Sequence, residues 1–110
     1  MKFLKYLCLG LLFCGCNSKE NISLPVDAIL IDVRTQAEYQ SGFIAGAINI
    51  PHDQIADKIA EVAPDKTTPI YLYCRSGRRV EIAISTLKKL GYTNLINLGG
   101  YDDAKRKLGK

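Results

Sequence analysis

The chain has 110 residues, which is room for one small domain, and it shows no low-complexity stretch or internal repeat, so disordered and solenoid architectures are excluded. Its net charge is +4, and subtracting Lys2 and Lys5 of the N-terminal segment leaves +2, without the clustered basic face that nucleic-acid binding requires. We expect the basic residues near the C-terminus to form a solvated helix end: Lys105, Arg106, Lys107 and Lys110.

The N-terminal segment has the parts of an export signal. Lys2 and Lys5 are followed by an apolar run over Leu7–Phe13. This run is too short to span a bilayer, which takes about twenty apolar residues. The run ends in Gly15-Cys16, which resembles a bacterial lipoprotein signal, where a small residue precedes the cysteine that is lipidated. An ordinary cleaved signal with a released product is the alternative.

This interpretation divides the chain into three parts: a signal peptide over 1–15, a lipidated N-terminus and tether over 16–24, and a folded domain over 25–110. Acyl chains on Cys16 would anchor the exported domain to a membrane of the cell envelope, in the periplasm. Cys8 and Cys14 then leave with the signal, so Cys74 is the one thiol of the domain. A lone cysteine in an exported protein is either buried and inert or reactive.

The first half of the domain begins, over 28–33, with a continuous apolar run that ends in a charge, which predicts a strand buried on both faces. Thr35 and Glu38 have the spacing of a capping box and predict a short helix. A short strand follows over 47–50, and the apolar stripe over 53–62 predicts a second helix.

In the second half, a strand over 70–74 leads through a polar loop into a helix over about 79–90. A strand over 94–98, a double glycine and a short helix over 102–108 complete the chain. Strands that alternate with helices predict an α/β fold, with a parallel sheet flanked by helices in a single domain. Functional residues in such folds gather at the carboxyl ends of the strands.

Cys74 stands at one of these carboxyl ends. The five residues that follow it are all polar, charged or glycine: Arg75, Ser76, Gly77, Arg78 and Arg79. Their backbone N–H groups, backed by a helix N-terminus, can form an anion-binding nest around the sulfur. Such a nest and three arginines stabilise a thiolate and predict a nucleophile, although a core cysteine packed as a small hydrophobe is the alternative.

Four motifs, in this order along the chain, together resemble the rhodanese-like sulfurtransferase family. Asp32-Val-Arg34 with Glu38-Tyr39 looks like D-V-R-x-x-x-E-[YF], and the segment 42–51 looks like G-H-I-x-G-A-x-N-I-P. The segment 70–79 resembles the family's active-site loop, and Gly91-Tyr92 with 97–100 looks like G-[YF]…L-x-G-G. The chain is most similar to small, single-domain, periplasmic members of the phage-shock type.

The resemblance implies a cofactor-free enzyme in which Cys74 takes a sulfane sulfur from thiosulfate or a similar anion, becomes a persulfide, and passes the sulfur to cyanide or a thiol. Residues 75–79 would supply the amides that hold this sulfur, and Arg75 and Arg78 would bind the anionic donor. Two ion pairs would support the loop: Arg79 with Asp32, and Arg34 with Glu38. We expect a monomer. A sulfur carrier, a redox sensor or a partner-binding module is the alternative function.

Two positions depart from the family. Phe43 stands where histidine is common, which matters little for the chemistry. Ala104 stands where many members have a tryptophan near the mouth of the site, so we expect a more open substrate entrance. His52, the one histidine, is interpreted as an exposed residue at a helix start rather than as a base for Cys74.

Two other site chemistries fit the sequence poorly. Related phosphatases place an arginine six residues after the cysteine, where this chain has Val80. One cysteine and one histidine cannot supply the four ligands of a structural zinc site, so no metal is expected.

Overall fold

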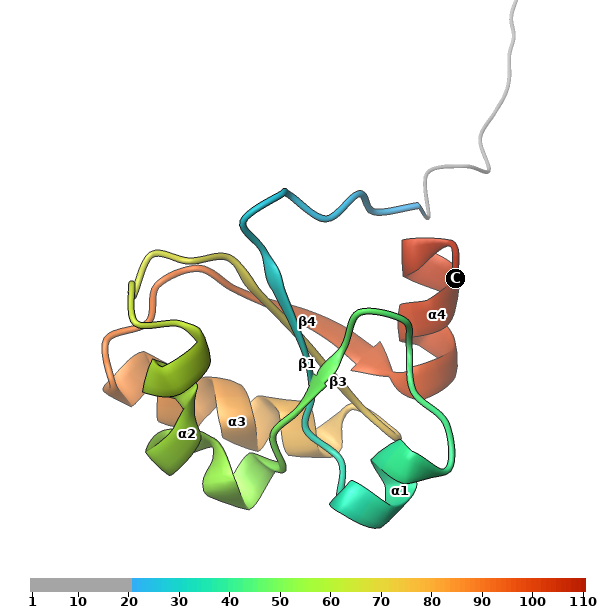
Figure 1. Ribbon diagram of the computed structural model, residues 1–110, viewed down its shortest axis with the longest axis horizontal. Helices are drawn as coiled ribbons and strands as arrows, with labels where there is room; N and C mark the ends of the chain where they lie inside the picture. Colours follow the sequence, from blue (N-terminus) through green and yellow to red (C-terminus); the bar gives the residue numbers. More distant parts are fainter. Residues whose placement is uncertain (1–20) are drawn as a thin grey trace, which may run out of the picture.

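A computed structural model describes residues 21–110, and the expected signal peptide and Cys16 lie outside the described residues. Strands and short helices alternate along this part of the chain (Figure 1). The elements are β1 Ile29–Asp32, α1 Gln36–Gln40, β2 Ile48–Asn49, the 3₁₀-helix η3 His52–Gln54, α2 Ile55–Val62, β3 Ile70–Cys74, α3 Arg78–Lys89, β4 Leu95–Gly100 and α4 Tyr101–Leu108.

The four strands form one parallel sheet in the order β2-β1-β3-β4, which confirms the predicted α/β fold. Strands β1 and β3 occupy the centre, with Ile29 opposite Ile70 and Asp32 opposite Tyr73. Because all strands run in one direction, their carboxyl ends meet at one edge of the sheet. Cys74 and the polar residues after β1 therefore lie at the same end of the domain.

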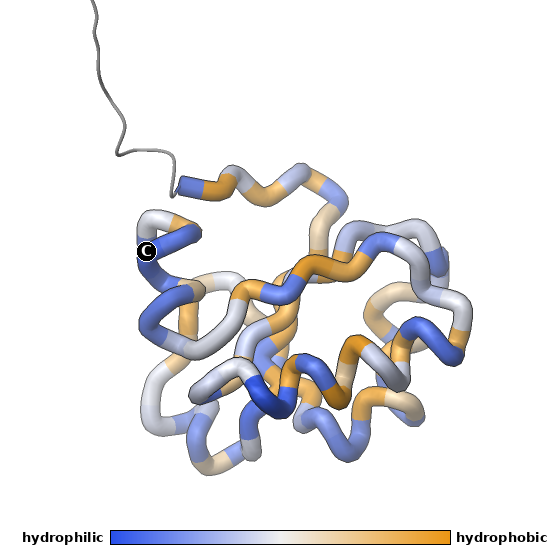
Figure 2. Tube along the Cα trace, turned by 180° about the vertical axis from the view of Figure 1, so that it is seen from behind, coloured by the Kyte–Doolittle hydropathy of each residue, from blue (hydrophilic) through white to orange (hydrophobic). Residues whose placement is uncertain are grey.

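The hydrophobic core has one layer on each face of the sheet. On one face, α2 and α3 cover the strands with buried side chains that include Ile59, Val80 and Leu87. On the other face, α4 contributes Ala104 and Leu108 to a second buried cluster. In Figure 2, α3 lies nearest the viewer and alternates hydrophilic and hydrophobic residues, as expected for a helix with one buried face.

Most element boundaries differ from the sequence predictions by one residue at an end, and larger differences occur in the helix after β2 and at the end of β4. The helix predicted over 53–62 is divided into η3 and α2. Strand β4 continues through the double glycine, because an irregularity after Leu72 shifts the register so that Tyr73 pairs with Gly99 and Cys74 with Gly100. Helix α4 then begins directly at Tyr101. Both glycines consequently lie beside the cysteine strand instead of beyond the sheet.

Within residues 21–110, no helix is long and apolar enough to cross a membrane.

Candidate active site

Cys74 ends the buried strand β3, and its side chain is fully buried on the α3 side of the sheet. The backbone N–H of Gly77 donates a hydrogen bond to Cys74 Sγ over 2.9 Å. Gly77 has a φ of 97°, a left-handed conformation that other residues rarely adopt, and it is the N-cap of α3. The chain therefore turns back on the sulfur within three residues, and the N-terminus of α3 points at the same region.

The loop after Cys74 is held from outside by the end of β4. Ser76 forms an antiparallel bridge with Gly100, and the N–H of Tyr101 donates to Arg75 O over 3.3 Å. A Cβ atom at Gly100 would lie only 2.6 Å from Arg75 O. The close approach of these two backbones therefore requires glycine at position 100, which gives the double glycine a role at the site.

The loop arginines fall into two groups. Arg75 and Arg78 are exposed, and within residues 21–110 the structure gives neither guanidinium an ion-pair or hydrogen-bond partner. Arg79 is half-buried and is fixed by a bidentate ion pair with Glu38, with N···O distances of 2.8 Å and 3.1 Å. Two cations of this loop are thus available to an anion, and the third ties α3 to α1.

This pairing differs from the Arg79–Asp32 pair expected from the sequence. Glu38 also completes the capping box, accepting from Thr35 at the start of α1, and so presents its carboxylate to α3. The hydrogen bonds from Arg79 are the main reason that the pKa of Glu38 falls to about 2, with a smaller lowering by Thr35. Glu38 is consequently held as an anion throughout the neutral and mildly acidic range.

Asp32 pairs with Arg34, whereas the sequence analysis paired Arg34 with Glu38. The guanidinium donates to both carboxylate oxygens, with Nη2–Oδ2 at 2.6 Å, and Nη2 also donates to Gly42 O. Asp32 is fully buried and Arg34 is 7% exposed, so each charge needs the other. The hydrogen bonds with Asp32 raise the pKa of Arg34. This pair lies under the site, next to β3.

Tyr73 connects this pair to the strand that carries Cys74. Its ring is fully buried, and its hydroxyl accepts a hydrogen bond from the N–H of Ile44 at 3.1 Å. Burial, together with a hydrogen bond to Asp32, raises the pKa of Tyr73 and keeps the phenol neutral. The residue before the cysteine is therefore fixed by a buried polar network.

Tyr101 is a residue of the site that the sequence analysis missed. The Arg34 guanidinium carbon lies 4.7 Å from the centre of the Tyr101 ring, and the Tyr73 ring centre is 5.9 Å away. Ala104, expected to mark an open entrance, is fully buried against the sheet. The aromatic side chain beside the site comes from position 101, directly after the double glycine.

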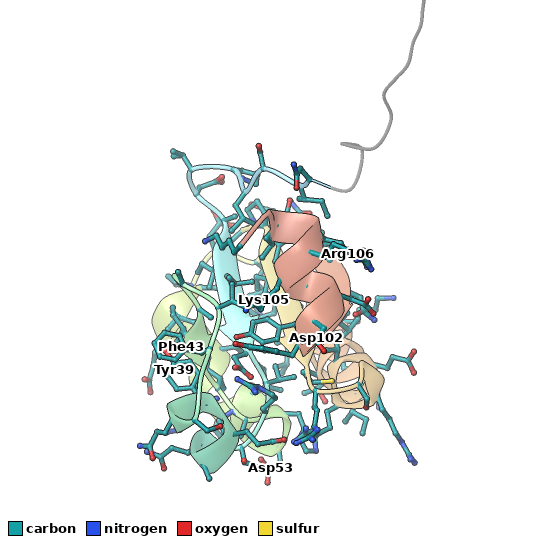
Figure 3. All side chains as sticks on the ribbon, turned by 90° about the vertical axis from the view of Figure 1, so that its right-hand side faces the viewer. Tyr39, Phe43, Asp53, Asp102, Lys105 and Arg106 are labelled. Atoms are coloured by element: carbon teal, nitrogen blue, oxygen red, sulfur yellow. The ribbon has the colours of Figure 1, made fainter. Side chains whose placement is uncertain are left out.

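Among the described residues, no hydrogen bond joins Cys74 Sγ to either of the two remaining residues singled out from the sequence. His52 lies at the start of η3, as expected, but it is half-buried where the sequence analysis expected an exposed residue. Phe43 stacks on Tyr39, with ring centres 4.2 Å apart, and the two rings lie side by side in Figure 3. Phe43 therefore has a packing contact in place of the polar group that family members commonly carry.

The comparisons with known proteins agree on one family. The family model for the rhodanese-like domain matches residues 18–107 of this chain. Thiosulfate sulfurtransferase PspE of Escherichia coli (strain K12) is 42% identical over 83 residues, which cover 74% of this chain and 80% of that protein. A sulfurtransferase of Allochromatium vinosum is 36% identical over 74 residues, 67% of each chain. The solved structure of a rhodanese with anions from E. coli aligns with a TM-score of 0.67 and 39% identity, covering 69% of this chain and 89% of that one.

Proposed function

This chain belongs to the rhodanese-like domain family, and we propose that it is a sulfurtransferase of the thiosulfate sulfurtransferase type that works through a persulfide on Cys74. The observation that carries the proposal is the position of Cys74 Sγ, which accepts a hydrogen bond from the Gly77 N–H inside a loop that leads into the N-terminus of α3. This environment favours negative charge on sulfur.

In the first half of the proposed cycle, the Cys74 thiolate attacks the outer sulfur of thiosulfate. A new S–S bond forms on Sγ, the S–S bond of thiosulfate breaks, and sulfite leaves with the electron pair. The product is the Cys74 persulfide. In this proposal the N–H groups of residues 75–79 hold its terminal sulfur, and the support is the hydrogen bond that the Gly77 N–H donates to Cys74 Sγ in a segment that turns back on the cysteine.

In the second half, cyanide or a thiolate attacks the outer sulfur of the persulfide. The acceptor gains that sulfur, as thiocyanate or as a new persulfide, and the S–S bond electrons return to Cys74 as a thiolate. No net oxidation occurs, so the cycle needs no redox cofactor.

The arginines divide between binding and positioning. Arg75 and Arg78, exposed and without a partner among the described residues, attract the oxygen atoms of the anionic donor. Arg79 holds the start of α3 through Glu38, and Asp32 with Arg34 supports β3 from below. These four residues position the loop.

We also propose that the chain is exported and anchored to a membrane of the cell envelope through lipid on Cys16, after removal of residues 1–15. The support is the sequence pattern of a basic start, a short apolar run and Gly15-Cys16. The anchored domain acts as a monomer.

Intact-mass measurement tests the mechanism. The protein is incubated with thiosulfate, freed of excess reagent and weighed beside Cys74→Ser. We expect the wild type to gain the mass of one sulfur atom, to lose it on addition of cyanide, and the variant to gain nothing. Failure of the wild type to gain sulfur from thiosulfate and also from polysulfide would overturn the enzymatic proposal in favour of a sensor or a binding module.

A further inference from the structure

Tyr101 is attached to the candidate active site through both its backbone and its side chain. Its N–H donates to Arg75 O over 3.3 Å, in the segment 75–77 that we call the Cys74 loop. Its ring lies over the Arg34 guanidinium, whose central carbon is 4.7 Å from the ring centre. The first residue of α4 therefore joins the Cys74 loop to the ion pair that supports β3.

The Tyr101 ring covers the buried ion pair on its outer side. The Arg34 guanidinium carbon is also 5.8 Å from the centre of the Tyr73 ring, and this ring is fully buried. Tyr101 is half-buried, whereas Arg34 is 7% exposed, so the Tyr101 ring lies between the pair and solvent. Lys105, one turn along α4, places Nζ 5.5 Å from the same ring centre. A flat aromatic face suits a guanidinium, and the exclusion of water strengthens its hydrogen bonds to Asp32.

The ring of Tyr101, and not its hydroxyl, carries this contact. Within residues 21–110 the Tyr101 hydroxyl has no hydrogen-bond partner, whereas the Tyr92 hydroxyl donates to Ala63 O over 2.6 Å. A Cβ atom at the exposed Gly42 would lie 3.8 Å from the Tyr101 hydroxyl oxygen, which is ordinary van der Waals contact. Phenylalanine at position 101 should therefore keep the arrangement, because it keeps the aromatic face.

The Cys74 loop is held from outside by backbone contacts with the junction of β4 and α4. Ser76 bridges to Gly100, and Arg75 O accepts from the N–H of Tyr101. The side chains of Arg75 and Ser76 are exposed and make no hydrogen bond within residues 21–110. The position of the loop therefore depends on the position of Tyr101, the residue at which α4 begins.

We propose that Tyr101 is a positioning residue for sulfur transfer. Its ring, fixed on the Arg34 guanidinium, holds its N–H where it fixes Arg75 O, and so sets the loop amides relative to Cys74 Sγ. Loss of the ring slows persulfide formation, because small displacements of groups that stabilise developing charge are costly. Donor binding is affected less, because the exposed guanidinium groups of Arg75 and Arg78 remain. This inference deepens the proposed function and rests on it.

The first test measures the rate of persulfide formation in a single turnover, by intact mass, over a range of thiosulfate concentrations. Tyr101→Leu keeps an apolar side chain and removes the aromatic face. We expect its maximal rate to fall about tenfold, while the half-saturating thiosulfate concentration stays within about twofold of the wild-type value. Tyr101→Phe should keep both values. Tyr101→Met is measured in parallel, so that the test remains available if one variant does not fold.

Tyr92 provides the matched control, because its ring also lies beside a cation, with Lys66 Nζ 5.4 Å from the ring centre. It precedes β4 and so lies at the amino ends of the strands, away from the Cys74 loop. Tyr92→Leu should lower the free energy of unfolding at least as much as Tyr101→Leu, because Tyr92 is 3% exposed. Its maximal rate should remain that of the wild type. Slowing of both variants in proportion to their lost stability would overturn the positioning role.

Hydrogen exchange of the reduced protein, without thiosulfate, tests the position of the loop independently of sulfur chemistry. We expect the amides of residues 75–79 and 100–103 to exchange about tenfold faster in Tyr101→Leu, and at the wild-type rate in Tyr92→Leu. Faster exchange in a protein that forms no persulfide would refute the enzymatic proposal and keep the structural link. Persulfide formation and exchange at wild-type rates in Tyr101→Leu would overturn the positioning role alone. Equal slowing by Tyr101→Phe would overturn the assignment to the ring.

Discussion

At the scale of single residues, the site depends on two backbones that approach each other where a side chain would not fit. Gly100 has an ordinary φ of −80°, so its requirement is steric: a Cβ would lie 2.6 Å from Arg75 O. Nothing in the sequence states which backbone approaches the double glycine. The contact appears only when β4 is placed beside β3, with Cys74 opposite Gly100.

Gly100→Ala should displace the Cys74 loop. We expect a loss of about 1–3 kcal/mol in the free energy of unfolding, because the added methyl group overpacks the contact. Sulfur transfer should slow by roughly 10-fold or more, because small displacements of reacting groups are costly. Urea unfolding and a thiosulfate–cyanide rate assay measure the two effects. Gly109→Ala, at the left-handed C-cap of α4, should lower stability by about 1 kcal/mol without slowing transfer. Wild-type transfer in Gly100→Ala would contradict the steric argument.

The buried pair Asp32–Arg34 gives a second residue-scale prediction. Arg34→Met leaves the fully buried Asp32 carboxylate without its cation, and we expect a loss of about 3–5 kcal/mol by urea unfolding. Asp32→Leu added to Arg34→Met should restore part of that loss, because no charge then remains unpaired. Arg106→Met removes a pair whose side chains are 53% and 60% exposed, so it should cost at most about 1 kcal/mol. Equal costs for the two arginine variants would refute the buried-pair argument.

At the scale of elements, periodicity and capping were sufficient for the order of strands and helices, but not for the ion pairs between them. Thr35 and Glu38 specify the start of α1 locally, through a capping box. Whether the free side of Glu38 meets Arg34 or Arg79 depends on where α3 begins relative to α1, which is a tertiary property. The sequence analysis therefore located the four charged residues at the correct edge and paired them wrongly.

The Glu38–Arg79 pair makes the link between α1 and α3 pH-dependent. Because the folded pKa of Glu38 is about 2, below the usual 4.5, its stabilising effect is complete above pH 4.5 and is lost as the pH falls toward about 2. Glu38→Gln keeps a capping-box residue and removes the charge. We expect it to lower the unfolding free energy by about 1–2 kcal/mol at pH 7, since the pair is three-quarters buried, and by a shrinking amount as the pH falls below about 4.5.

Unfolding of wild type and Glu38→Gln in urea, at a series of pH values from 7 to about 2.5, measures this difference. Arg79→Met should reproduce the same pH dependence, and adding it to Glu38→Gln should cost little more than either change alone. A difference that is independent of pH would assign the effect to local helix capping and not to the ion pair.

At the scale of the whole molecule, the fold was predictable because the apolar pattern of nearly every element shows whether it is a strand or a helix and which side of it is buried. The mainly apolar runs over 28–33 and 70–74 pack on both faces and form the central strands β1 and β3. The boundary of the domain was less predictable. Residues 16–24 were expected to be a tether, but Ile22 and Leu24 are half-buried and pack against the cluster beneath α4. Two apolar residues in a polar segment give no periodicity from which to infer this contact.

This packing predicts that the stable domain begins before residue 25. The free energy of unfolding of a chain of residues 25–110 should be about 2 kcal/mol lower than that of residues 21–110. The shorter chain loses two half-buried aliphatic side chains and the hydrogen bond from the Ile22 N–H to Lys107 O. Ile22→Ala/Leu24→Ala in the longer chain should reproduce most of that loss, whereas Ser23→Ala, at an exposed position between them, should not. Both chains should form the Cys74 persulfide equally, since the contact lies at the end of α4 remote from the loop. Equal stability of the two chains in urea would show that residues 21–24 serve as a tether alone, and the shared sulfur transfer would still place the catalytic unit within 25–110.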